Sequence, residues 1–126
     1  MARPTVSFDF IHDRSVDTQK TNAVQVPGWA RNAAVYIPAL GTNCAVAMEL
    51  IELADVTAAL LLASNDTSWN EVRDADQDAQ VAASGVEDCW IDITLLIQSL
   101  PAGCFIRFTL GSAQAADSSW VLVFRG

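Results

Sequence analysis

The chain has 126 residues, a length that suits one domain with its own hydrophobic core. Hydrophobic residues make up 52% of the chain and charged residues 17%, which excludes intrinsic disorder. The formal net charge is −8, from 15 acidic and 7 basic residues. This acidic balance argues against a nucleic-acid partner, because phosphate binding needs clusters of Lys and Arg.

Most of the apolar periodicity has the period of two that is typical of β-strands. Turn signals rich in Pro, Gly, Asn and Asp separate many of the apolar runs. The runs predict an all-β, single-domain antiparallel β-sandwich or jelly roll of about eight short strands, with an N-terminal arm. The predicted strands span residues 6–10, 24–26, 33–37, 46–53, 58–63, 69–73, 90–96, 105–110 and 119–125.

Residues 43–62 allow two interpretations. They are rich in Ala and can be drawn as a helix, but Val46, Met48 and Leu50 also alternate as in a strand. Because Asp55 begins a plausible turn, two strands are favoured over one helix.

Charge and polarity divide the chain near residue 35. Residues 1–36 carry four basic and three acidic side chains, whereas residues 37–126 carry three basic and twelve acidic ones. We predict an N-terminal strand with an arm or loop that packs on neighbours at 1–34, and a β-sandwich domain at 35–126. Within the first part, residues 13–22 are polar and are expected to form an exposed loop, or an arm that lies on a neighbouring subunit.

No segment predicts export or membrane insertion. The N-terminal residues lack an apolar signal region. The longest uncharged runs, 32–48 and 93–106, are shorter than a membrane span and contain Pro and Gly. The chain is therefore expected to be soluble and made in the cytoplasm, without a membrane partner.

The three cysteines, Cys44, Cys89 and Cys104, are widely spaced and form no C-x-x-C pair. Because there is no such pair and His12 is the single histidine, the sequence argues against a structural zinc site. Buried free thiols are expected; one disulfide with a spare thiol is the alternative.

Asp74, Asp76 and Asp78 have the D-x-D-x-D spacing of the first ligands in a calcium loop. Ala79 and Gly85 stand where such a loop needs its glycine and glutamate. An acidic surface turn is therefore expected, with a weak Ca²⁺ site as the alternative and no other cofactor.

Catalytic signatures are sparse. His12 beside Asp13 could act as a general base, but the sequence shows no motif that supplies a nucleophile for it. The chain has no G-x-S-x-G sequence and no phosphate-binding glycine loop. Asp88 and Asp92 form a carboxylate pair of the kind that glycosidases use, but no cleft is predicted around them. We expect the protein not to be an enzyme.

The tryptophans supply the remaining signal. Trp90 and Trp120 lie in predicted strands and are expected in the core. Trp29 follows Pro27-Gly28 in a predicted loop and is the best candidate for an exposed contact.

Residues 59–81 (ALLLASNDTSWNEVRDADQDAQV) combine a hydrophobic strand, a polar turn and an acidic turn. Residues 105–112 (FIRFTLGS) and 120–125 (WVLVFR) form two closing strands around an Ala-rich loop. In these features the chain resembles small β-sandwich structural proteins of tailed bacteriophages, over residues 59–126. The resemblance implies a virion protein made in the host cytoplasm, most specifically a capsid decoration (cement) protein on the outer shell. It implies the major capsid protein as partner and a homo-oligomer, with a trimer favoured.

The distinct charge of the N-terminal part suggests that it makes the capsid contact. The candidate partner-binding residues are Arg3, Arg14, Lys20, Trp29 and Arg31. On this hypothesis, deletion of residues 1–34 abolishes particle binding and leaves the sandwich folded. The alternative functions are a carbohydrate-binding β-sandwich of a phage tail or fibre, which uses exposed Trp and acidic residues, and a head–tail connector protein.

Overall fold

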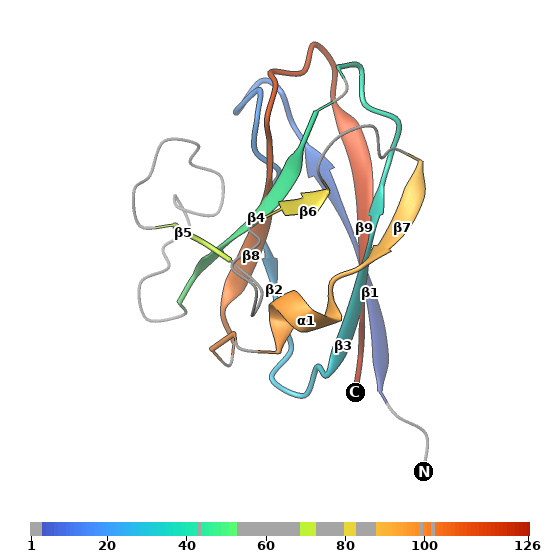
Figure 1. The fold of residues 1–126 in the computed structure, drawn as a ribbon, viewed down its shortest axis with the longest axis vertical. Helices are drawn as coiled ribbons and strands as arrows, with labels where there is room; N and C mark the ends of the chain where they lie inside the picture. The colour runs from blue at the N-terminus through green and yellow to red at the C-terminus, as the bar shows by residue number, and fades with distance from the viewer. Residues whose placement is uncertain are drawn as a thin grey trace.

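A computed structural model of the chain describes residues 4–42, 44–52, 69–72, 80–82, 88–98, 100–101 and 103–126. Within these residues the structure contains nine strands and one short helix (Figure 1). In chain order they are β1 (Thr5–His12), β2 (Val24–Gln25), β3 (Asn32–Ile37), β4 (Val46–Ile51), β5 (Asn70–Glu71), β6 (Gln80–Ala82), β7 (Cys89–Asp92), α1 (Thr94–Ile97), β8 (Phe105–Leu110) and β9 (Ser118–Arg125).

The strands form two antiparallel sheets that pack as a sandwich. The first, named here the β9 sheet, has the order β1-β9-β3-β7. The second, the β8 sheet, has the order β2-β8-β4-β5, and β6 also pairs with β4. Since β5 and β6 pair with different parts of β4, each sheet is four strand positions wide. The predicted all-β antiparallel sandwich is confirmed.

The pairing is nested from the outside of the chain inward. β1 pairs with β9, β2 with β8, β3 with β7, and β4 with β5 and β6. Two further pairings, β3 with β9 and β4 with β8, join these ribbons into sheets. This nested arrangement across two sheets is the jelly roll, the more specific of the two predicted folds.

Side chains that alternate along the strands build the core between the sheets. On β9, the inward residues Trp120, Leu122 and Phe124 are fully buried, while their neighbours point outward. From the β8 sheet, the Phe108 ring stacks on Trp120 with 5.6 Å between centroids, and Phe10 of β1 packs against both rings. These aromatic rings join the two sheets near the centre of the sandwich.

One predicted strand is too long. The strand expected over residues 90–96 ends at Asp92, and Thr94–Ile97 form helix α1. The Asp92 carboxylate accepts the Thr94 N–H at 2.9 Å, so this amide is taken by a local side chain instead of a neighbouring strand. Leu96 and Ile97 then fold back onto the core.

The region with two interpretations forms a strand in the part that the structure describes, since β4 covers Val46–Ile51. The predicted strand 58–63 lies outside the described residues. β6 was not predicted. No helix in the described ranges is long and apolar enough to cross a membrane.

The N-terminal strand is part of the sandwich. β1 pairs along its whole length with β9, and a boundary at residue 34 falls inside β3. Removal of residues 1–34 therefore takes away an edge strand, β2 and half of β3, so this deletion is not expected to leave the sandwich folded.

Candidate functional site

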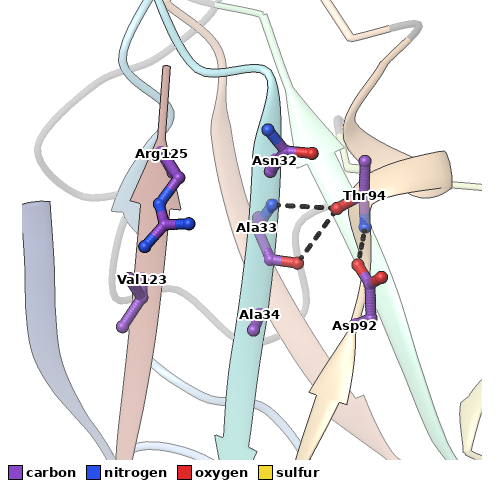
Figure 2. A pocket seen from close by; sticks show the side chains of 7 residues that line it. All are labelled: Asn32, Ala33, Ala34, Asp92, Thr94, Val123 and Arg125. Carbon is purple, nitrogen blue, oxygen red and sulfur yellow. Dashed lines mark hydrogen bonds between the residues drawn. The ribbon is translucent and has the colours of Figure 1, made fainter. Parts of the chain in front are cut away.

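The outer face of the β9 sheet contains a shallow hollow of about 530 Å³. Its floor is formed by short side chains, because Ala34 lies in register with Val123 on one side and Asp92 on the other. Asn32 and Arg125 pair one row further along and close one end (Figure 2). The hollow therefore offers an amide, a guanidinium and a carboxylate around a small apolar floor.

The carboxylate at this hollow is fixed in place. The Thr94 amide donates to the Asp92 carboxylate at 2.9 Å, and the Thr94 hydroxyl together with this amide lowers the pKa of the Asp92 carboxyl. The Thr94 hydroxyl oxygen also accepts the Ala33 N–H at 3.2 Å (Figure 2). These bonds connect the end of β7 to β3 and hold the Asp92 side chain at the rim.

An exposed aromatic pair lies next to the hollow on the same face. Trp90 is 54% exposed, and its ring lies 5.6 Å from that of Tyr36, which faces it on β3. The Tyr36 hydroxyl donates to the carboxylate of Asp88, and this hydrogen bond raises the pKa of the tyrosine. Trp90 and Tyr36 thus form an exposed apolar surface, named here the aromatic ledge, which the Asp88 carboxylate borders.

The predicted core position of Trp90 is wrong, whereas that of Trp120 is confirmed. Trp90 is two residues from Asp92, and residues two apart on a strand share a face. Because Cys89 and Ile91 occupy the inward positions, the tryptophan is placed in solvent. The alternation with Asp92 is the sequence signal that could have located this residue.

A second exposed group lies where the described chain ends meet. The Arg31 amide donates to the Arg125 carbonyl at 2.8 Å, and the Gly126 amide donates to the Pro4 carbonyl at 2.9 Å. The Trp29 ring borders Gly126 and is 39% exposed, as predicted for this tryptophan. We call Trp29, Arg31 and Arg125 the chain-end cluster. Within the described ranges, neither of its arginines forms an ion pair.

The predicted partner-binding residues are therefore only partly brought together. Trp29 and Arg31 are neighbours, and Arg125, which was not predicted, joins them through strand pairing. Arg14 lies elsewhere, where its amide donates to the Asp117 carboxylate at 2.9 Å. Arg3 lies outside the described residues.

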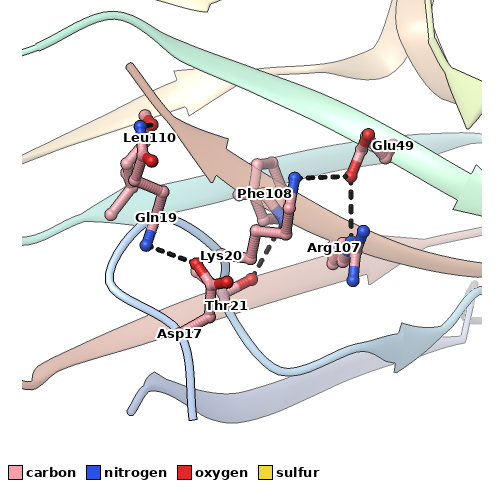
Figure 3. Close-up of polar contacts among 8 residues, drawn as sticks. All are labelled: Asp17, Gln19, Lys20, Thr21, Glu49, Arg107, Phe108 and Leu110. Carbon is pink, nitrogen blue, oxygen red and sulfur yellow. Dashed lines mark hydrogen bonds and ion pairs between the residues drawn. The ribbon is translucent and has the colours of Figure 1, made fainter. Parts of the chain in front are cut away.

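Lys20 is engaged within its own chain. Its ammonium lies 3.5 Å from Glu49, which also accepts from Nε of the buried Arg107 at 2.9 Å (Figure 3). The backbone around Lys20 pairs with β8: the Thr21 N–H donates to the Phe108 carbonyl, and Lys20 forms an antiparallel β-bridge with Thr109. The stretch 18–21, predicted to belong to an exposed loop or arm, is thus held on its own β8 sheet, because β8 offers it unpaired backbone groups.

Of the remaining candidates, those that the structure describes are buried or half-buried. His12 is fully buried, with Nε2 2.7 Å from the Asp17 carbonyl oxygen. All three cysteines are free: Cys44 and Cys104 are buried, as predicted, and Cys89 is half-buried. Asp74, Asp76 and Asp78 lie outside the described residues, and the part of the chain that is described contains no cluster of three potential metal ligands.

No family model, curated protein or solved structure matches this chain. Its function must therefore be argued from the fold and from the two exposed groups, the hollow with its aromatic ledge and the chain-end cluster. Both are open surfaces, which suit binding to a partner or ligand.

Proposed function

We propose that this chain is a non-enzymatic virion structural protein that decorates the outer shell of a tailed-phage head by binding the major capsid protein. The jelly-roll topology supports the proposal, because viral capsid domains commonly use it. The strand-and-turn pattern of residues 59–126 supports it further, through the resemblance to small phage structural proteins.

The chain-end cluster is the observation that carries the proposal. Trp and Arg are the residue types that most often dominate the energy of protein interfaces. Here Trp29 is well exposed, and Arg31 and Arg125 concentrate positive charge at one end of a molecule with net charge −8. Such an end suits a partner surface that presents carboxylates, while the acidic remainder is repelled from that surface.

Symmetric copies would strengthen this contact. We propose a homo-oligomer, with a trimer favoured, because several chain-end clusters presented together gain affinity through their high effective concentration. A weak individual contact of one tryptophan and two arginines then suffices to hold the oligomer on the shell.

The test combines particle composition with matched variants. Many copies spread over the head, counted by quantitative gel and electron microscopy, support decoration. A few copies at one vertex or on the tail favour a connector or tail protein, and absence from particles overturns the virion role.

For the contact itself, W29A and R31E should weaken binding to undecorated particles. R14E is the control, because Arg14 is an exposed arginine outside the cluster. If R14E loses binding and R31E keeps it, the assigned surface is wrong.

A further inference from the structure

We propose that the outer face of the β9 sheet binds an oligosaccharide, with Trp90 stacking on a pyranose ring and the residues of the hollow hydrogen-bonding to its hydroxyl groups. This proposal rests on Trp90 and the hollow and not on Trp29 or Arg31, so it is tested separately from capsid binding; Arg125 alone belongs to both groups.

Trp90 supplies the stacking surface. It is a large aromatic side chain that remains 54% exposed, although burial of its ring would be favourable. The neighbouring Tyr36 ring, tilted by 51° to it, supports the indole from the side and is itself held by its bond to Asp88. The C–H-bearing face of a sugar ring is apolar and slightly positive, so it complements the negative face of an aromatic ring.

The hollow supplies room and polar groups. Ala34 and Val123 leave space beside the ledge, and Asp92 and Asn32 border it with planar groups that can each bond to adjacent hydroxyls (Figure 2). Strand spacing and rise place Trp90 about 16 Å from Arg125, across two strands and two rows of side chains. That distance suits a short oligosaccharide better than a single sugar.

The polar groups are also prepared for binding. The Asp92 carboxylate is held by the Thr94 amide at 2.9 Å, so little side-chain freedom is lost when a ligand hydroxyl donates to it. Arg125 forms no ion pair within the described ranges and faces the other end of the hollow. It can donate to hydroxyls or to the carboxylate of an acidic sugar.

The charges on this face favour a sugar over a second copy of the chain. Asp9 and Asp92 share the face, and Asp88 borders it, against the single cation Arg125 among the described residues of this face. A two-fold dimer would place this face against itself and bring like charges together, which is costly in a desolvated interface. A ligand with hydroxyl donors meets no such repulsion.

The experiment probes a panel of defined neutral and acidic short oligosaccharides with the intact chain. Binding to the parent and to every variant is measured by isothermal titration calorimetry. In W29A it is also read by protection of tryptophan fluorescence from acrylamide, because Trp90 is then the main exposed tryptophan while Trp69 and Trp120 are buried. W90A and D92N should each weaken binding by about tenfold or more, whereas W29A should bind like the parent. R125Q should weaken binding of acidic probes more than of neutral ones.

Three results overturn the proposal. The first is that no probe on the panel binds, and the second is that W29A removes binding while W90A keeps it. The third is that light scattering shows an oligomer that dissociates in W90A, while none of the oligosaccharide probes disrupts it. That result would make this face an interface between copies of the chain. Near-UV circular dichroism of each variant confirms that the sandwich is intact.

Discussion

On the outer side of the β8 sheet, Glu49 forms ion pairs with Lys20 and Arg107. Replacing Glu49 tests how much these ion pairs contribute to the free energy of unfolding. The Arg107 side chain is only 3% exposed, and its guanidinium lies over the Trp69 ring at 4.2 Å. Removing one partner of a buried ion pair costs about 3–5 kcal/mol. Because the Glu49 side chain is 19% exposed and the contact with Trp69 remains, we expect E49Q to lower the free energy of unfolding by about 2–3 kcal/mol.

The matched variant replaces both partners. The double substitution E49L with R107M removes the buried pair together and keeps the packing volume. The remaining cation, Lys20, has a side chain that is 26% exposed and can be hydrated, so the double variant should stay within about 1 kcal/mol of the parent. Urea unfolding followed by tryptophan fluorescence measures all variants. If E49Q alone changes the free energy of unfolding by less than about 0.5 kcal/mol, or if the double variant loses as much as E49Q, then Glu49 does not stabilise the fold by pairing with Arg107.

Three further predictions concern the core and the rim of the hollow. Truncation of Trp120 to Ala should lower the free energy of unfolding by about 3–5 kcal/mol in urea titrations, and a loss below about 1 kcal/mol would contradict its central position. Burial raises the pKa of the Cys104 thiol from 9.0 to about 11, so the folded state holds this proton more tightly. Stability should therefore fall as the pH rises from 9.0 to about 11, and C104A should flatten that part of the profile. T94V removes the hydroxyl that lowers the pKa of Asp92, so an NMR titration should show this pKa closer to 3.8. Since the folded pKa of Asp92 is lowered, its contribution to stability is present above 3.8 and is lost as the pH falls through the folded value.

Strand positions were predictable because alternation is a local signal. β1, β3, β8 and β9 each lie within two residues of the predicted bounds, since one face of each strand is apolar along its length. The same signal assigns Arg107 and Thr109 to the outer face of β8, as observed. Alternation does not report whether an outward residue is covered, and Arg107 is buried because Trp69 and Glu49 lie over it.

The candidate sites depend on contacts between distant segments, which composition and period do not specify. Arg31 and Arg125 meet only because β3 and β9 are neighbours, and Ala34 forms a floor only because Val123 and Asp92 flank it. The size and apolarity of Trp90 suggested that it lies in the core. Its place in the strand, between the inward-facing Cys89 and Ile91, puts it on the outer face instead. Polarity likewise suggested that residues 18–21 are solvated, whereas their polar backbone groups bond to β8.

The nested pairing also determines when the molecule can fold during synthesis. β9 lies between β1 and β3, so β1, the first strand of the β9 sheet, has no hydrogen-bonding neighbour until residues 118–125 have left the ribosome, whereas β3 can already pair with β7. Until then, the apolar side of β1, with Phe8 and Phe10, is exposed to solvent or to other nascent chains. Closure of this first-to-last pairing requires the longest loop in the chain, which slows folding to the order of milliseconds to seconds. Nascent chains that stall before residue 118 should therefore be the species that aggregate and that chaperones retain.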